Sequence, residues 1–540
     1  MVPPGKRAAQ RFRAAALFLA MLLASAPCVP QSPGGERTRR FTFDDPKYGS
    51  IVLARVGNNE ITAREFLFSY EFGPAFTRRE KNSRRRYLTF MTYEKLLALT
   101  GYEKGLDTSD DARTSLNEVE GDLATEELYK ADVRGKVRVT NEEIVAGMKR
   151  DEPHCTVRWL YARTRSEIDS LGRLLARGAA FDSLYARQTG DSAMREERSM
   201  ETTPFRIGLK NPRLAAVIDT LPFRLNSAPI PAPDGYYIVR VSDRWTNAMP
   251  TPSELAQRRS DVERALLEYK SDSLSDQYIR KMMEGAKPVI VRKPFDIVET
   301  HLAEIALGPK KFAEWGLAER LRKRWGDVDF HDLKPIGKEA LVTLSGRTFT
   351  VNEYLNWYHA RETSVSFATA APKAFFLSLE QTVWRMVRDR LLVARARSRR
   401  LQNRGTVKKQ MEWWKDKIVY RLVRNEIADS IQLDDMFLRS YFSAHRRDFR
   451  STTGDTVTFE RAKEDVRKDC YEAELTKRLL HRLLALKEKY GVAIREEDLA
   501  RLPLDDEFDP RAIDVYTVKK GGTFPRPAFP SIDYEWQTWQ

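Results

Sequence analysis

The sequence of 540 residues predicts an α+β protein that is mostly helical, with one helical module present in two copies and a compact α/β domain inserted into the first copy. Two observations support this fold class. The strand–turn–helix phrase VLARVGNNEITAREFLFSY returns much later as LVTLSGRTFTVNEYLNWY, and long segments with apolar residues at helical spacing follow both phrases. A segment of shorter strands and helices at 153–247 interrupts the first copy only.

Residues 1–28 predict a cleaved secretory signal peptide. MVPPGKRAAQRFR is basic, and AAALFLAMLLASA is an apolar run that ends in small residues and is too short to span a bilayer stably. A retained anchor is one alternative. Lipidation at Cys28 is another, although Pro27 stands where a small residue is wanted before a lipidated cysteine. We therefore expect an exported protein.

The formal net charge of +15 does not by itself indicate a nucleic-acid partner. Lysines and arginines alternate with acidic residues, as in EELYKADVRGKVRV, so nucleic acid is not expected. The exception is TRREKNSRRRY, which holds Arg78, Arg79, Arg84, Arg85 and Arg86. Two interpretations of this patch stay open, a solvated helix start and a contact with an anionic membrane surface.

The sequence offers no pattern typical of a metal or cofactor site. The six histidines are scattered, and GxSxG, HExxH and glycine-rich phosphate loops are absent. Cys155 and Cys470 are the two cysteines after the signal peptide, and a single bridge between them stays open. We expect neither a metal nor a cofactor.

The first copy of the helical module is expected at 50–152 and the second at 341–500. Each begins with two short strands around a glycine, Gly57 or Gly346, and continues into a helix after Thr62 or Thr350. A threonine at this position predicts a helix start, because its hydroxyl can accept hydrogen bonds from the unpaired N–H groups of the first turn.

Each copy also ends in the same way. KVRVTNEEIVAGMKR and SIQLDDMFLRSYFSAHRR both place a capping residue, Thr140 or Asp434, before another helix. A long helix and a short strand then close the module, at 250–300 in the first copy and before 500 in the second. The closing strands of the first and second copies are expected at 289–291 and 492–494, respectively.

Two further segments complete the organisation. Residues 301–340 predict helices that link the copies, read as one helix pair within 298–340. Residues 501–540 are rich in proline, glycine and acidic residues and contain Trp536 and Trp539. This composition favours an extended tail that lies on the body of the protein.

In this order of segments the chain resembles SurA-type periplasmic chaperones and the related parvulin-type (PpiC-like) peptidyl-prolyl isomerases. Within 153–247, VRWLYARTRSEIDSLGRLLARGAAFDSLYARQTGDS is similar to the first strand, first helix and "Ga-F-LA" phrase of parvulins. VIDTLPFRLNSAPIPAPDGYYIVRVSDR is similar to their "F-L--GevS-PV---GyHiikv" phrase. The resemblance implies a parvulin-like domain at 153–247 and a periplasmic location.

Parvulins place two histidines side by side beneath the prolyl substrate, and this chain has lost both. Trp159 stands at the first histidine position and Tyr237 at the second. Asp191 falls where parvulins keep an Asp or Cys, and Leu214 and Ile218 match apolar pocket positions. The "GdLGw" phrase of the family is missing. The resemblance therefore implies a degenerate isomerase domain without assigned catalytic residues.

Three interpretations of the altered positions stay open. The aromatic residues fill a domain core, or they form a groove for extended peptides, or catalysis survives through Asp191 alone. The groove would use two aromatic residues from each half of the domain and two apolar pocket residues, namely Trp159, Tyr161, Leu214, Ile218, Phe223 and Tyr237.

The resemblance implies an ATP-independent periplasmic chaperone that binds unfolded envelope or outer-membrane proteins. An active parvulin-type isomerase is the first alternative, and a non-catalytic cell-envelope scaffold is the second. Aromatic residues on long helices, such as Trp413 and Trp414, suit either a cradle for unfolded chains or ordinary helix packing.

Overall fold

The computed structural model describes residues 46–72, 82–190, 198–232, 235–247, 249–361, 365–449, 457–502 and 530–533, with Phe524 and Trp536. The predicted signal peptide with Cys28, and Arg78, Arg79, Asp191 and Trp539, lie outside the described residues. The described chain is mostly helical with small antiparallel sheets, which confirms the predicted α+β class. It divides into two compact units, one containing 132–278 and the other containing 39–131 and 279–540.

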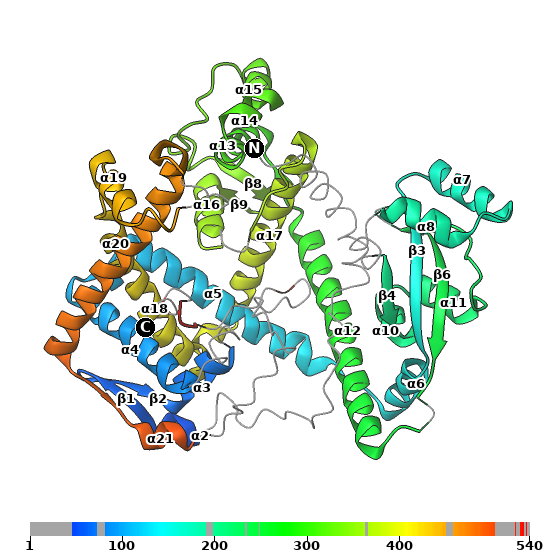
Figure 1. Cartoon of the computed structure of the whole chain (residues 1–540), viewed down its shortest axis with the longest axis horizontal. Coiled ribbons are helices and arrows are strands. Elements are labelled where there is room, and N and C mark those ends of the chain that lie inside the picture. Colours follow the sequence, from blue (N-terminus) through cyan, green and yellow to red (C-terminus); the bar gives the residue numbers. More distant parts are fainter. Residues whose placement is uncertain are drawn as a thin grey trace. The chain divides into compact units, whose positions relative to one another are not determined.

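The smaller unit, 132–278, is built around one antiparallel sheet with the strand order β4-β3-β6-β5 (Figure 1). The division from the rest of the chain falls within its last helix, at Tyr278. Its elements in chain order are α6 (Asn141–Asp151), β3 (His154–Ala162), α7 (Arg165–Ala176), α8 (Phe181–Thr189), β4 (Ser199–Thr202), α10 (Pro204–Lys210), α11 (Pro212–Thr220), β5 (Ile230–Ala232), β6 (Gly235–Trp245) and α12 (Pro252–Ala286).

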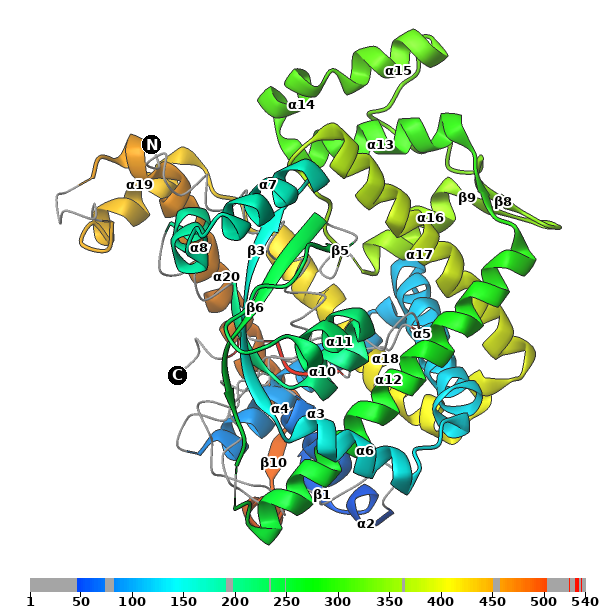
Figure 2. The ribbon, with the colours of Figure 1, turned by 90° about the vertical axis from the view of Figure 1, so that its right-hand side faces the viewer.

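Helices cover both faces of this sheet because its two central strands are apolar on both sides (Figure 2). Leu160 and Ile238 pack against α7 and α8 on one face. Val157, Trp159 and Tyr237 pack against α10 and α11 on the other. Alternate side chains of a strand point to opposite faces, so the nearly continuous apolar run of β6 has a partner layer on each side.

The compact unit is larger than the predicted insert at 153–247. Helix α6 packs with α10 and α12 through Ile144, Phe205 and Val262. The helix begins at the predicted cap Thr140, whose hydroxyl accepts a hydrogen bond from the N–H of Glu143 at 3.3 Å. Hence the segments that flank the insert in sequence belong to the same unit as its sheet.

The larger unit contains two β-hairpins, each followed by helices. The first group comprises α2 (Pro46–Gly49), β1 (Val52–Val56), β2 (Asn59–Thr62), α3 (Ala63–Phe72), α4 (Ser83–Glu103), α5 (Asp110–Asp132), α18 (Gly405–Asp429), α19 (Asp435–Ala444), α20 (Phe459–Tyr490), β10 (Val492–Ile494) and α21 (Glu496–Ala500). The second comprises β7 (Val289–Ile290), α13 (Arg292–Leu307), α14 (Pro309–Trp315), α15 (Leu317–Trp325), β8 (Ala340–Leu344), β9 (Arg347–Thr350), α16 (Val351–His359) and α17 (Pro372–Ser398). The predicted linking region is thus three helices, α13 to α15, where a pair was expected.

The two hairpins share their turn and their helix start. Gly57 and Gly346 adopt positive φ angles of 58° and 79° in the turns, a conformation that favours glycine. Thr350 Oγ1 accepts a hydrogen bond from the N–H of Glu353 at 3.2 Å, and the Glu353 carboxylate accepts one from the N–H of Thr350 at 2.8 Å. Thr62 exchanges the same pair of bonds with its glutamate three residues on. The helix starts predicted at both threonines are confirmed.

Each hairpin is completed by a third strand from a distant part of the chain. β10 pairs with β1, with Ala54 opposite Ile494. β7 pairs with β8, with Ile290 opposite Val342. The strand that follows the closing helix α12 therefore joins the second hairpin, and the strand that follows α20 joins the first.

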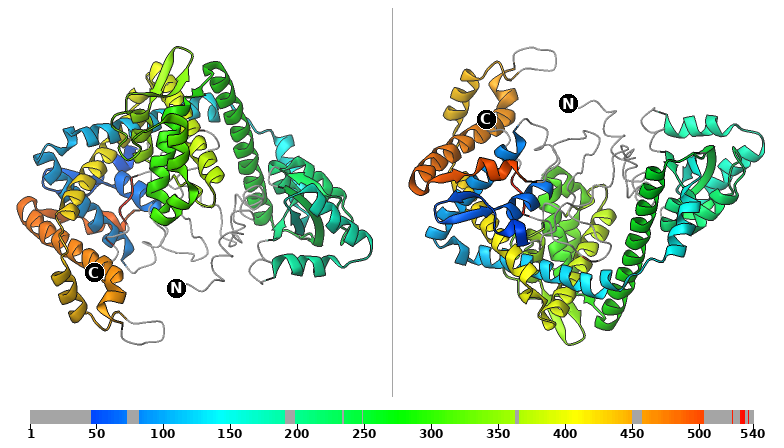
Figure 3. Two further views of the ribbon diagram at one scale, coloured as in Figure 1. Left: turned by 90° about the horizontal axis from the view of Figure 1, so that it is seen from above. Right: turned by 90° about the horizontal axis from the view of Figure 1, so that it is seen from below.

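Helices α4 and α18 lie side by side over the first hairpin (Figure 3), and a glycine allows their close approach. A Cβ added at Gly101 of α4 would overlap the side chain of Val419 and would lie 2.9 Å from Cγ2 of Val423, both on α18. The two helix backbones therefore approach more closely at Gly101 than a larger residue would permit.

We predict that Gly101→Ala destabilises the larger unit by about 1–3 kcal/mol, because the added methyl group overpacks the contact between α4 and α18. The matched control is Gly285→Ala in α12, where the added Cβ would meet nothing within 4 Å. That substitution should raise stability by up to about 1 kcal/mol through helix propensity. Chemical denaturation of both variants measures the difference. Equal stability of the two would contradict the close approach.

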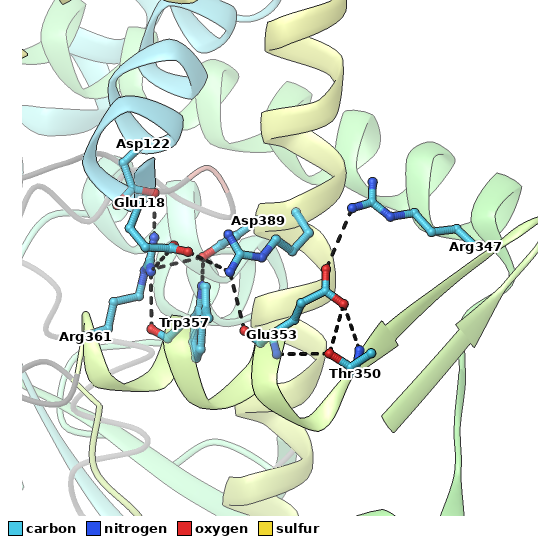
Figure 4. A network of polar contacts seen from close by, with 9 residues as sticks. Glu118, Asp122, Arg347, Thr350, Glu353, Trp357, Arg361 and Asp389 are labelled. Carbon is cyan, nitrogen blue, oxygen red and sulfur yellow. Dashed lines mark hydrogen bonds and ion pairs between the residues drawn. The ribbon is translucent and has the colours of Figure 1, made fainter. Parts of the chain in front are cut away.

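A buried charge network connects α5 to the second hairpin group (Figure 4). The Arg361 guanidinium donates to Glu118 Oε2 at 2.8 Å and to Asp122 Oδ1 at 2.7 Å. Its Nε lies 3.9 Å from Asp389 of α17, and Arg390 reaches the other Glu118 oxygen at 2.6 Å. The Arg361 side chain is 14% exposed and that of Asp389 is 4% exposed, so these charges are largely removed from water.

The electrostatic cost of this burial is visible in the pKa values. Burial raises the pKa of Asp122 to about 6, although Arg361 opposes the shift. Burial disfavours the charged form of Arg361 as well, but Asp122, Asp389 and Glu118 together raise the pKa of its guanidinium. Arg361 is therefore the group that favours the charged form of Asp122 in this core.

Replacing Arg361 with methionine should destabilise the larger unit by about 3–5 kcal/mol, because the buried Asp122 would lose its cation. Glu118 and Asp389 would each lose one cation and keep another, Arg390 and Arg388, at 2.6 Å. The loss should be smaller at pH 5 than at pH 8, since protonation of Asp122 removes one of the charges. Arg397→Met is the control. It removes an exposed pair with Glu120, whose side chains are 44% and 34% exposed, and should cost less than about 1 kcal/mol. Denaturation at the two pH values tests both statements; equal effects of the two variants would refute the role of Arg361.

Of the helices that the structure describes, none combines the length and apolar composition that a membrane span requires.

Candidate functional site

The two altered parvulin positions lie on the central strands of the sheet in the smaller unit. Trp159 of β3 is opposite Val239 of β6, and Tyr161 is opposite Tyr237. The rings of Tyr161 and Tyr237 are 5.1 Å apart between centroids. Trp159 is 6% exposed and Tyr237 is 4% exposed. The sheet therefore brings both residues to one face, as diagonal neighbours on adjacent strands.

Side chains fill the space over this face. The remaining volume beside Trp159 and Tyr237 is about 10 Å³, which is close to the minimum for a single water molecule. The side chains around it come from the sheet and from α10 and α11: Val157, Met200, Ile207, Asn211, Leu214, Ile230, Ala232 and Val239. Trp159 and Tyr237 thus occupy the position of core residues.

The other predicted binding residues divide into two kinds. Leu214 and Ile218 are buried at 4% and 0% exposure and belong to the same core. Tyr161 is partly buried, and Phe223 is 49% exposed. An aromatic groove at Trp159 and Tyr237 would require this core to open, whereas Phe223 already faces solvent.

The chemistry of the altered positions differs from that of a paired imidazole site. An indole offers one donor and no acceptor, and a phenol offers one hydroxyl group. Neither side chain can exchange a proton near neutral pH as an imidazole can. Trp159 and Tyr237 therefore supply packing and ring contacts to this sheet.

A second candidate region is an open groove along α20, which the sequence analysis did not single out. It has a volume of about 730 Å³ and is lined by Tyr441, Asp469, Glu472, Ala473, Thr476, Lys477, Leu480, His481 and Leu484. Leu480 is 46% exposed and Leu484 is 58% exposed. On neighbouring α19, Met436 and Phe437 are 77% and 45% exposed. We call the residues lining the groove, together with Met436 and Phe437, the α19–α20 surface.

The sequence does contain a signal for this surface. In LTKRLLHRLLALKEKY, one leucine row of α20 (Leu475, Leu479, Leu483 and Leu486) is buried in the core. The adjacent leucines Leu480 and Leu484 form a second row four residues apart. A helix with one buried face needs only one such row, so the second row indicates a further apolar contact.

A third candidate region is a small cavity between α4 and α18. Its volume is about 80 Å³, and both apolar and charged side chains line it, among them Ile61, Met91, Trp413, Ile532, Glu65, Glu94, Lys95, Asp416 and Lys417. Trp413 packs on Phe68 with ring centroids 6.0 Å apart, so this aromatic residue takes part in helix packing and also lines a cavity. We call this region the α4–α18 cavity.

Ion pairs link the charged groups of the α4–α18 cavity. Lys95 pairs with Asp416, whose other oxygen accepts a hydrogen bond from Tyr102 at 2.6 Å. Lys417 donates to Glu94 at 2.7 Å and is only 5% exposed. Burial raises the pKa of Glu94, although Lys417 opposes the shift. The two partners of each ion pair are 321 and 323 residues apart in sequence, so the sequence alone does not bring them together.

Among the described residues, no group of three or more His, Cys, Asp or Glu side chains is arranged to hold a metal ion. Cys155 and Cys470 are buried free thiols, so the bridge left open by the sequence is not formed. Burial raises the pKa of Cys155 to about 11, which leaves its thiol protonated and poorly reactive at neutral pH.

Comparisons with known proteins find similarity in solved structures. No family profile matches the chain, and none of the curated proteins matches it. The peptidylprolyl isomerase PrsA from Bacillus cereus is similar at 17% identity and a TM-score of 0.22, covering 41% of this chain and 88% of that one. The foldase protein PrsA from Streptococcus pneumoniae is similar at 15% identity and a TM-score of 0.20, covering 41% and 87%. These structural neighbours are thus PrsA foldases.

The burial of Trp159 leads to a prediction for the smaller unit. Trp159→Ala should cost about 3–5 kcal/mol of unfolding free energy, because it leaves a cavity between the sheet and α11. Phe223→Ala, at an exposed position, should change it by no more than about 0.5 kcal/mol. Thermal unfolding of the two variants tests this contrast. A Trp159→Ala protein as stable as the parent would favour a groove over a core.

Proposed function

We propose that this protein is an ATP-independent periplasmic chaperone of SurA type, which holds unfolded envelope or outer-membrane proteins. Its parvulin-like domain is not a working prolyl isomerase. The observation that carries the proposal is the burial of Trp159 and Tyr237 at the positions where parvulins keep their paired histidines. Both residues serve the domain core, and the polar pair needed for isomerisation is gone.

The order of elements in the smaller unit supports the parvulin-like part of the proposal. The quoted first strand lies in β3, the first helix is α7, the "Ga-F-LA" phrase begins α8, and the GYYIVRV phrase lies in β6. The first strand, the first helix and the GYYIVRV strand therefore fall in the kinds of element that the resemblance implied. A domain can keep this architecture after its catalytic residues are lost, because a fold does not depend on the particular side chains that carry its function.

Duplication of the helical module is part of the same proposal. The first copy is 50–152 with 250–300, and the second is 341–500. Shared features support it: a positive-φ glycine in each hairpin turn, a Thr–Glu capping pair at each following helix, and a closing helix that leads into a third strand. β7 follows the closing helix of the first proposed copy but pairs with the second hairpin, and β10 follows the closing helix of the second copy but pairs with the first hairpin.

The α19–α20 surface is the best candidate for client contact. An open groove with exposed Leu480 and Leu484 can accept apolar side chains of an unfolded chain without a specific sequence. Asp469 and Glu472 on its edge keep the surface hydrated. Such a surface binds with modest affinity, and modest affinity permits client release without ATP.

Localisation and partners complete the proposal. Export rests on the basic and apolar halves of residues 1–28, with lipidation at Cys28 as the alternative form of attachment. Unfolded envelope proteins are the proposed partners. The arginine-rich segment is a further contact for an anionic membrane surface; its described arginines include Arg85, which pairs with Glu496 at 2.7 Å.

Two assays on the purified protein test the proposal. It should suppress aggregation of an unfolded outer-membrane protein, and it should leave the cis–trans exchange of a proline peptide at its uncatalysed time of tens to hundreds of seconds. Clear acceleration of this exchange would favour the active isomerase. Absence of both activities would favour the envelope scaffold.

The client surface has its own matched variants. Leu480→Ser with Leu484→Ser should weaken suppression of aggregation about tenfold or more, since two apolar contacts of roughly 1–2 kcal/mol each are lost. Ile305→Ser, at a position 69% exposed on α13, should have little effect. Equal activity of the double variant and the parent protein would exclude the α19–α20 surface.

A further inference from the structure

Residues 530–533 and Trp536 lie in a groove between α4 and α18. Ile532 is 3% exposed and Trp536 is 1% exposed, although both belong to a segment whose composition predicts an extended tail. The Trp536 ring lies against Tyr93 of α4 and Tyr420 of α18, at centroid distances of 5.7 and 6.0 Å. The two helices thus form an aromatic slot for this side chain.

Polar contacts fix the same segment at one point of the groove. A single oxygen of Glu94, Oε1, accepts hydrogen bonds from the backbone N–H of Asp533 at 3.0 Å and from Trp536 Nε1 at 3.1 Å. Lys417 donates to this same oxygen at 2.7 Å and also pairs with the Asp533 carboxylate at 3.2 Å. Glu94 and Lys417 therefore recognise a backbone N–H, an indole N–H and a carboxylate together.

The charge of Asp533 matches the groove. Burial alone would raise the pKa of its carboxyl group, but Lys417, Tyr420 and Arg421 hold it below its usual value. Without Asp533, Lys417 would lose one of its two carboxylate partners while its side chain is only 5% exposed. The groove thus requires an occupant with a negative charge at this position.

The manner of attachment differs from that of a permanent core segment. Residues 530–533 belong to neither a helix nor a strand, so side chains and one backbone N–H make the contacts described above. Ile532 and Ser531 also line the α4–α18 cavity, which leaves about 80 Å³ unfilled between the tail, Met91 and Trp413. Residues 530–533 can therefore leave without breaking a strand or helix, with only a short 3₁₀ turn at Trp536 beside them, and the groove has room for a larger side chain than Ser531.

We propose that the groove between α4 and α18 is a peptide-binding site and that residues 530–533, with Trp536, are its resident occupant. Its ligand class is an extended peptide that presents an apolar residue, a carboxylate next to it and an aromatic residue three positions after the carboxylate. This inference rests on the proposed function, because unfolded client segments would be the competing ligands. The tail holds the site closed until such a segment displaces it.

Exchange of the tail with a synthetic peptide tests the proposal on the full-length protein. The probe is the fluorescein-labelled peptide PSIDYEWQTWQ, which repeats residues 530–540. In the wild-type protein the intact tail should compete with the probe. In the Trp536→Ala protein the site should be open more of the time, and the apparent affinity for the probe should rise about tenfold or more, in proportion to the open fraction.

The matched control changes the probe and leaves the protein intact. A peptide with Asn in place of Asp533 and Ala in place of Trp536 should bind the Trp536→Ala protein at least about tenfold more weakly than the parent peptide, because it lacks both recognised groups. Equal binding of the two peptides would overturn the proposal. So would equal affinity of folded Trp536→Ala and wild-type proteins for the parent peptide.

A second measurement does not depend on the variant being folded. Saturating unlabelled peptide should speed hydrogen exchange at the backbone N–H of Asp533 in the wild-type protein, since displacement of the tail breaks its bond to Glu94. Unchanged exchange would show that the segment is a fixed part of the core. Peptide exchange without suppression of aggregation would refute the proposed chaperone function alone, and suppression without peptide exchange would refute this inference alone.

Discussion

The arrangement of helices in the larger unit depends on the buried guanidinium of Arg361. It joins Glu118 and Asp122 of α5 to Asp389 of α17, and it lies 5.1 Å from the ring centroid of Trp357 (Figure 4). Taking these charges out of water is costly, and the cost is offset only when every partner is in place. A small rotation or slide of α5 would leave a carboxylate unpaired. The network therefore favours a single arrangement of these helices, whereas apolar packing alone would allow several arrangements.

Lys417 acts by the same principle at another place in this unit. It sits between Glu94 and Asp533, so a single cation joins α4, α18 and the end of the chain. Lys417 and Arg361 differ in the kind of segment that contains their partners. Arg361 contacts long helices that have many other contacts, whereas Asp533 belongs to a segment without regular structure. The same kind of ion pair can thus make a permanent joint in one place and a reversible one in another.

Features that depend on neighbours in sequence could be predicted from the sequence. The turns at Gly57 and Gly346 and the caps at Thr140 and Asp434 follow from local backbone geometry, and the structure has all four. The apolar positions of the long helices were visible for the same reason. The sequence does not show which apolar row of α20 stays exposed, because the exposure of Leu480 depends on which helices pack against α20.

The charge networks could not be predicted because their members are distant in sequence. Nothing near Glu118 indicates that its partner is Arg361, and nothing near Glu94 points to Trp536. The altered positions Trp159 and Tyr237 could be located by resemblance, but their burial depends on how tightly α10 and α11 close over the sheet. Tertiary packing decided each of these features.

The pairing of β10 with the first hairpin sets an order of events during synthesis. The first hairpin is made early, yet the strand that completes its sheet, β10, lies near the other end of the chain. Until β10 is made, β1 keeps one edge unpaired, and an unpaired edge favours association with other chains. A product that stops before Val492 would retain this open edge permanently. The sheet is therefore complete only in products that extend through Ile494, and shorter products should be the ones that quality-control proteases remove.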